Sequence, residues 1–241
     1  MRTRTARLSL TSACAALYAG FGYLTYLGIF TPVVGVVRFW PAVIIPALFS
    51  VIFGPLIGGL GAAIGIFISD LVIHGNALLS LTVGVPANFI GFYLIGVLSR
   101  RNFNWKSISL FSVFLFGVIA LVTYFAEVNG MLGNDVALVL LGTCALTLAL
   151  LLLIGSLWKE WRSYEVASFI GLLVGSGIIG LGVWGFSQFF VLPQGGFKLP
   201  IYVALIWFLW TFLTEIPFLV VLGPPALKVL RKAVPSGGVW R

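Results

Sequence analysis

Apolar residues fill most of this chain in long runs, and short polar segments separate the runs. As helices rising about 1.5 Å per residue, these runs are long enough to cross, or nearly cross, a hydrocarbon core of about 30 Å. The pattern predicts spans at residues 8–30, 39–53, 56–73, 80–98, 107–126, 135–157, 166–190 and 200–222. The expected fold class is therefore all-α, a polytopic transmembrane helix bundle of about eight spans.

The boundary between the second and third spans is set by Gly54 and Pro55. Proline cannot donate a backbone hydrogen bond, and glycine admits dihedral angles that other residues avoid. A single helix over 39–73 would also put Asp70 and Arg100 on the wrong sides of the membrane. We therefore expect a tight hairpin here. The alternative is a bundle of six spans in which some runs merge or re-enter.

Composition supports a membrane protein and excludes a soluble globule. Hydrophobic residues make up 61% of the 241 residues and charged residues 8%, and the mean hydropathy is +1.15. Too few polar residues remain to cover a soluble surface. The run from Leu8 to Phe30 exceeds a signal-peptide core, so we expect a retained span. The chain reads as one integral domain of the cell membrane, 1–241, with a short basic cytoplasmic tail at 223–241.

The net charge of +8 indicates topology and not nucleic-acid binding, because the basic residues cluster at the ends of apolar runs. Lys and Arg flanking spans are retained in the cytoplasm. The loops predicted on one side carry only Arg38 and Lys198. The other side carries Arg2, Arg4, Arg7, Arg100, Arg101, Lys106, Lys159, Arg162, Lys228, Arg231, Lys232 and Arg241. This asymmetry predicts cytoplasmic N- and C-termini.

Small residues recur at close spacing in two of the spans. In the third span, glycines three or four positions apart predict close packing against other helices of the same chain. In the first span, Ala15 and Ala19, with the parallel pair Ala16 and Gly20, predict a flat face near the cytoplasmic end. That face can dock on another subunit.

Polar residues inside apolar runs are the candidates for function, because an ionised group in lipid normally faces a cavity or a partner. Asp70 lies one turn from the outer end of the third span, and His74 follows four residues later on the same helical face. The pair either faces a ligand at the outer mouth or holds the neighbouring loop, which contains Asn76. His74 is the only histidine, so this chain alone cannot bind a bis-histidine haem.

Three further residues have both a structural and a ligand-binding interpretation. Asn88, two residues after Pro86, either satisfies a proline kink or lines a cavity. Arg38 and Trp40 at the outer start of the second span fit snorkelling and an aromatic belt. They would equally suit an anionic, planar ligand.

The later spans offer fewer candidates. Trp184 and Gln188, four residues apart near the outer end of the seventh span, can reach a cavity at the level of Asp70. Glu215 lies two residues before Pro217 in the last span, and we expect it to pair with a cytoplasmic cation such as Lys228 or Arg231, or with a free backbone donor.

The first half of the chain, residues 10–101, resembles the substrate-binding S components of energy-coupling factor transporters. The resemblance rests on the alanine face of the first helix, the short second helix ending in Phe53-Gly54-Pro55, the glycine run leading to Asp70, and the Pro86/Asn88 helix closing at Arg100-Arg101. It implies a small subunit that captures a vitamin, a precursor or a trace metal from the outer side. It also implies docking through Ala15 and Ala19 on a transmembrane coupling subunit that carries cytoplasmic ATPases.

The same stretch is also similar to eight-helix membrane sensor domains that precede histidine kinases and cyclases, which share the Trp40-Pro41 start and the closing arginine pair. S components usually have six helices, so the helix count favours the sensors. We expect no soluble output domain after 222, which argues against them. A sensor or scaffold subunit of a larger membrane complex is therefore the alternative to a transporter subunit.

An enzyme is not expected, since the sequence has one histidine, no His-Glu-x-x-His and no Gly-x-Ser-x-Gly. It also lacks a phosphate-binding glycine loop, so partners must hydrolyse any ATP. We expect no cofactor and no metal site. Cys14 and Cys144 lie within apolar runs, and a trace-metal substrate is disfavoured because His and Cys ligands are scarce. The expected partners are membrane lipid, the subunits named above and a small organic solute, with an aromatic or heterocyclic one favoured.

Overall fold

The structure is a computed structural model that describes residues 4–29, 33–34, 37–38 and 40–233. The described residues are helical, apart from loops and two short antiparallel strands, β1 (Val33–Val34) and β2 (Val37–Arg38). The helices are α1 (Arg4–Leu24), α2 (Ile44–Phe53), α3 (Pro55–Ile73), α4 (Ala77–Leu79), α5 (Val85–Leu98), α6 (Trp105–Val128), α7 (Asn134–Leu157), α8 (Arg162–Ser187) and α9 (Tyr202–Ala233).

Short turns of other helix types extend several of these helices. A π-helical turn at Thr25–Ile29 follows α1, and another at Ser80–Gly84 joins α4 to α5. Turns of 3-10 helix at Pro41–Val43 and Lys159–Trp161 precede α2 and α8.

Six helical stretches in the described part of the chain are long and apolar enough to cross a membrane. They are Pro55–Ile73, Ala77–Leu98, Trp105–Val128, Asn134–Leu157, Lys159–Ser187 and Tyr202–Ala233. The stretch Pro41–Phe53 is apolar but shorter. The prediction of a helical bundle with helices of membrane-spanning length is therefore confirmed.

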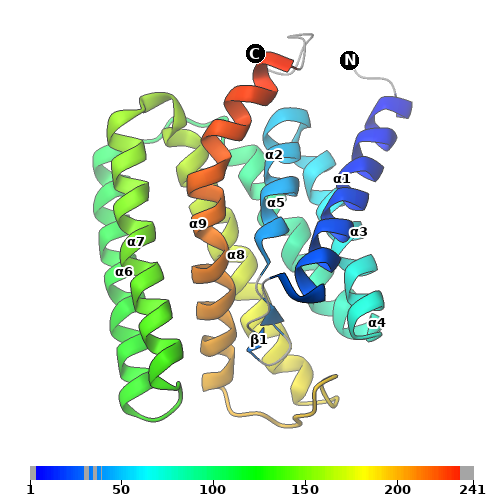
Figure 1. Ribbon diagram of the computed structural model, residues 1–241, viewed down its shortest axis with the longest axis vertical. Coiled ribbons are helices and arrows are strands. Elements are labelled where there is room, and N and C mark those ends of the chain that lie inside the picture. The colour runs from blue at the N-terminus through cyan, green and yellow to red at the C-terminus, as the bar shows by residue number, and fades with distance from the viewer. Residues whose placement is uncertain (1–3, 30–32, 35–36, 39, 234–241) are drawn as a thin grey trace.

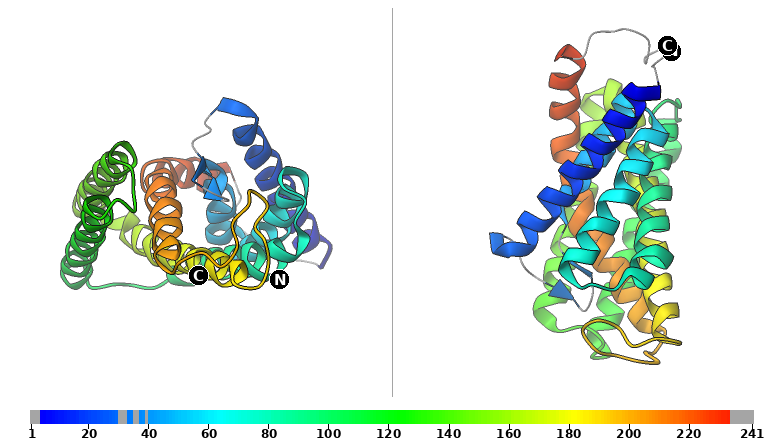
Figure 2. Two further views of the ribbon diagram at one scale, coloured as in Figure 1. Left: turned by 90° about the horizontal axis from the view of Figure 1, so that it is seen from below. Right: turned by 90° about the vertical axis from the view of Figure 1, so that its right-hand side faces the viewer.

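The helices form an elongated bundle with a separate hairpin at one side (Figure 1). α3 contacts α1, α2 and α5, while α8 contacts α5 and α9. The α6–α7 hairpin lies at one edge of the bundle (Figure 2, left). Its main contact with the other helices is between α7 and α9. α1 begins and α9 ends at the same end of the bundle, where the α5–α6 and α7–α8 connections also lie (Figure 1).

The predicted hairpin at Gly54 is confirmed, so a single helix over 39–73 is excluded. Gly54 ends α2 with a φ of 123°, which favours glycine, and Pro55 occupies the first turn of α3. α2 then packs so closely on α3 that a Cβ atom on Gly58 would collide with Ser50. The predicted packing role of the α3 glycines is confirmed in the same way at Gly65, where a Cβ would lie 2.8 Å from the carbonyl oxygen of Ala15.

The small-residue face of α1 needs a correction. Ala15 and Ala19 are only 3% and 9% exposed, because they lie on the side of α1 that packs against α3. Ser69 of α3 donates a hydrogen bond to the carbonyl oxygen of Ala19. Ala16 and Gly20 are exposed instead, and no atom lies within 4 Å of a Cβ placed on Gly20. The small-residue pair that α1 leaves exposed is therefore Ala16 and Gly20.

Candidate functional site

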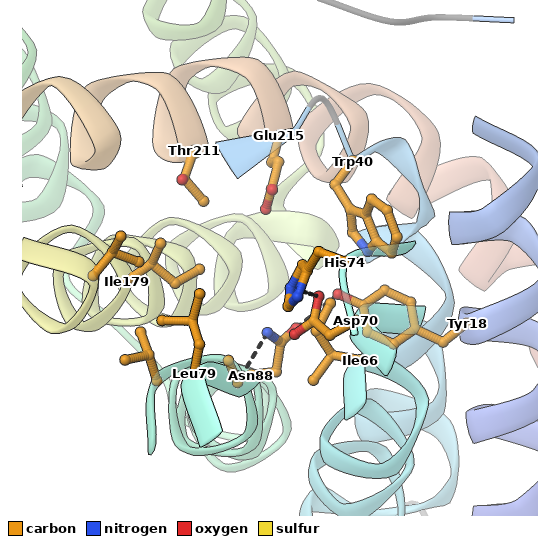
Figure 3. A pocket seen from close by; sticks show the side chains of 13 residues that line it. Tyr18, Trp40, Ile66, Asp70, His74, Leu79, Asn88, Ile179, Thr211 and Glu215 are labelled. Carbon is orange, nitrogen blue, oxygen red and sulfur yellow. Dashed lines mark hydrogen bonds and ion pairs between the residues drawn. The ribbon is translucent and has the colours of Figure 1, made fainter. Parts of the chain in front are cut away.

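A cavity lies between α1, α3, α5, α8 and α9, with Trp40 at one side (Figure 3). The cavity, together with the open solvent at its mouth, has an empty volume of about 650 Å³. The centre of a water molecule can move through about 90 Å³ of this volume. One water needs only about 10–15 Å³ by the latter measure, so the cavity has room for several waters or a small solute. Its walls are Tyr18, Trp40, Ile66, Asp70, His74, Leu79, Val83, Gly84, Asn88, Ile179, Val183, Thr211 and Glu215.

Asp70 anchors a polar network on the α3 side of the cavity. Ser80, in the π-helical turn before α5, donates a hydrogen bond of 2.7 Å to Oδ2 of Asp70. Nε2 of His74 lies 3.3 Å from Oδ1 of the same carboxylate. Asn76 donates its backbone N–H to Nδ1 of His74 at 3.1 Å. The carboxylate thereby links the last turn of α3 to the segment that leads into α5.

These contacts define the tautomer of His74. Because Nδ1 accepts the hydrogen bond from Asn76, it carries no proton, and the ring proton sits on Nε2, facing Asp70. His74 and Asp70 also line the cavity. The pair can therefore both hold the neighbouring loop and face the cavity, which are the two roles that the sequence suggested for it.

Tyr18 and Asn88 form a second polar contact across the cavity wall. The hydroxyl of Tyr18 donates a 2.7 Å hydrogen bond to Oδ1 of Asn88, and Nδ2 of Asn88 donates to the carbonyl oxygen of Gly84 at 2.9 Å. Asn88 thus satisfies backbone near Pro86 and still lines the cavity. Tyr18 also meets Trp40 edge to face, with ring centroids 6.1 Å apart. The α1 side of the cavity is consequently aromatic.

Glu215 and Thr211 are polar side chains that α9 directs toward the cavity (Figure 3). Glu215 is 6% exposed and has no hydrogen-bond or ion-pair partner among the described residues. The hydroxyl of Thr211 is buried and likewise has no partner there. The expected pairing of Glu215 with Lys228 is wrong, because thirteen residues of helix separate them by about 20 Å.

Four of the eight predicted ligand-binding residues line this cavity: Trp40, Asp70, His74 and Asn88. Asn76 instead caps α4, where its side chain accepts a hydrogen bond from the backbone N–H of Leu79. The backbone of Arg38 pairs with Val33, and its side chain lies outside the described residues.

Trp184 and Gln188 do not line the cavity. Nε1 of Trp184 and Nε2 of Gln188 both donate to the carbonyl oxygen of Leu199, at 3.0 and 2.9 Å. They fasten the segment between α8 and α9 to the end of α8. Their polar groups point at this loop because its backbone carbonyl needs donors.

Sequence reasoning did not select Tyr18, Thr211 or Glu215 as site residues. They come from α1 and α9, which lie about 200 positions apart in the chain, so no spacing rule connects them with Asp70. One available signal was the four-residue step from Thr211 to Glu215, which places both on one face of a helix.

The arrangement is suited to binding. No group of three or more His, Cys, Asp or Glu side chains in the described ranges is placed to hold a metal ion. The cavity offers carboxylates, hydroxyls, an imidazole and an amide between aromatic and aliphatic walls, which is the usual composition of a small-molecule site.

No family model, curated protein or solved structure matches this chain. Its function is inferred from the bundle and from the cavity.

Proposed function

We propose that this chain is a solute receptor of the cell membrane, the substrate-binding integral subunit of an energy-coupling-factor-type transporter. It captures a small organic solute from the outer side for ATP-driven uptake by partner subunits. The supporting observation is the cavity lined by Asp70, Asn88 and Glu215 inside a bundle of apolar helices. Buried polar groups are costly in lipid and are typical of sites for substrates or ions.

The proposed topology has eight crossings with both termini in the cytoplasm. α1, with Arg4 and Arg7 in its first turn, and α2 supplement the six helices of full spanning length. α1 begins and α9 ends at one end of the bundle, together with the connections that carry Arg100 and Lys159 (Figure 1). Basic residues at this end favour a cytoplasmic location for it. Asp70 lies in the last turn of α3, toward the opposite end, so in this topology the cavity opens near the outer side.

The energy for uptake comes from partners in this proposal. The sequence lacks a phosphate-binding glycine loop, which supports ATP hydrolysis by partner subunits. We place the contact with a transmembrane coupling subunit at the exposed pair Ala16 and Gly20 of α1. Small residues allow such helices to approach closely in lipid, where packing drives association.

A sensor or scaffold subunit is the second candidate, and the eight apolar runs favour it. In that case the same cavity binds a solute, and altered helix packing signals to a separate partner without net transport.

Affinity purification from native membranes in mild detergent, with mass spectrometry of proteins and small molecules, distinguishes the two. A transporter subunit co-purifies with a coupling subunit, two ATPases and a solute. A kinase or a respiratory complex in their place supports the sensor or scaffold. If no small molecule co-purifies under any condition, the receptor proposal fails.

A matched pair of variants tests the docking face. Gly20→Leu and Gly142→Leu both add a side chain at an exposed glycine with no atom within 4 Å of its Cβ, one on α1 and one on α7. We expect Gly20→Leu to lose the coupling subunit and Gly142→Leu to keep it. Equal recovery of the coupling subunit with both variants would remove α1 as its docking site.

A further inference from the structure

We infer that the solute carries a protonated nitrogen with N–H donors, and that Glu215 and Thr211 of α9 bind this group. The inference rests on the proposed receptor function and adds the chemical class of the ligand. Small amines, amidines and protonated nitrogen heterocycles belong to this class.

The first observation is the isolation of the Glu215 carboxyl group. It is almost fully buried within a membrane-spanning helix, yet no donor among the described residues contacts it. A buried carboxyl group in a membrane helix normally faces a partner, a relay or a bound ligand. Figure 3 shows it directed toward the cavity that Asp70 and Asn88 line from the other side.

The second observation concerns Thr211, one helical turn before Glu215. Threonine in a helix commonly donates its hydroxyl to the carbonyl oxygen four residues earlier. Thr214 does so to Trp210, and Thr123 does so to Ile119. Thr211 does not, and its buried hydroxyl remains without a partner beside the cavity. Two adjacent polar groups on one face of α9 are therefore left for a ligand.

The other polar groups in the wall are already engaged. Asp70 accepts from Ser80 and faces His74, the imidazole contacts Asp70 and Asn76, and Asn88 binds Tyr18. The groups that remain are chiefly acceptors, because a carboxylate accepts only and a hydroxyl can accept. Acceptors of this kind select a ligand that donates, and a cationic donor also neutralises the carboxylate.

The rest of the wall indicates the remainder of the solute. Tyr18 and Trp40 supply aromatic surface, and Val83 and Ile179 supply aliphatic surface. A planar or ring-shaped apolar portion suits such walls. The inferred ligand is thus a small cation with one N–H donor group and one apolar ring.

Three probes of nearly equal shape test this inference: benzamidine, a cation; benzamide, neutral; and benzoate, an anion. Each is added at about 10 mM, tenfold above a dissociation constant of about 1 mM, and thermal unfolding of the detergent-solubilised full chain is followed. At that ratio a bound probe raises the melting temperature by roughly 3–6 °C. We expect this shift with benzamidine alone.

Two buried carboxyl groups provide a matched pair of variants. Glu215→Gln removes the proposed cation partner and should abolish the benzamidine shift. Glu165→Gln changes a buried carboxyl group that does not line the cavity, and should retain it. An undiminished benzamidine shift in Glu215→Gln would overturn the inference.

Failure of the inference differs from failure of the receptor function. If benzamide or benzoate stabilises the chain as much as benzamidine does, and Asp70→Asn removes the effect, the chain is a receptor for a solute of another class. If no probe shifts the melting temperature, the cation inference is overturned. The small molecules that co-purify with the native protein then decide whether the receptor function stands.

Discussion

Replacing Glu165 by methionine should stabilise this protein, although it removes a charged residue near the end of a helix. Glu165 lies in the first turn of α8, is 0% exposed, and neither carboxyl oxygen has a hydrogen-bond partner among the described residues. A buried polar group without a partner costs about 1–3 kcal/mol. Methionine has a similar length, is apolar and adapts to irregular space.

Two smaller effects oppose this gain. An acidic side chain in the first turn of a helix contributes about 0.3–1 kcal/mol through the helix dipole. Repacking of a volume-conserving substitution costs less than about 1.5 kcal/mol. With the middle of each range, the expected net gain is about 0.5–1 kcal/mol, which raises the melting temperature by roughly 1–4 °C in a chain of this size.

The assay can use the two cysteines of the chain, Cys14 and Cys144, which are both buried and free. A thiol-reactive fluorescent dye labels them only as the bundle unfolds, so its signal reports the melting temperature. Glu160→Met is the control, because Glu160 is exposed and a surface substitution changes stability by less than about 0.5 kcal/mol. A melting temperature of Glu165→Met several degrees below that of the parent would refute the reasoning, since it would show that the carboxyl group has a stabilising partner.

Three further substitutions probe a hydrogen bond in the cavity wall and the packing of the helices. Tyr18→Phe leaves the buried oxygen of Asn88 without its 2.7 Å hydrogen bond and should cost about 1–2 kcal/mol in a chemical or thermal unfolding measurement; unchanged stability would argue against that contact. Gly65→Ala should destabilise the bundle by about 1–3 kcal/mol, because its Cβ would press on the backbone of α1. In contrast, Gly142→Ala on an open face of α7 should add about 0.5–1 kcal/mol through helix propensity. If Gly65→Ala and Gly142→Ala change the melting temperature by the same amount and in the same direction, α1 does not pack closely on α3 at Gly65.

Much of the helical architecture could be predicted from the sequence, because long apolar runs and Gly-Pro breaks act locally. The run 56–73 became α3 almost residue for residue, and Gly54 ended α2 through its own backbone conformation. The side of α1 that packs inward could not be predicted. Ala15 and Ala16 are chemically identical neighbours, and only the position of α3 decides which of them is buried.

The candidate site was predicted in part for the same reason. Asp70 and His74 are four residues apart on one helix, so local spacing placed them together. Trp184 and Gln188 have the same spacing, but the carbonyl oxygen of Leu199 takes their donors. Glu215 joins the cavity because α9 packs beside α8, which depends on contacts between distant parts of the chain.

Filling the cavity tests the receptor proposal most directly. Ile179→Trp adds bulk to the α8 wall and leaves every polar group of the cavity in place. We predict that the parent purifies from native membranes with a bound small molecule, and that the variant purifies folded without it. Recovery of the same molecule in the same proportion from the variant would contradict the claim that this cavity binds the solute.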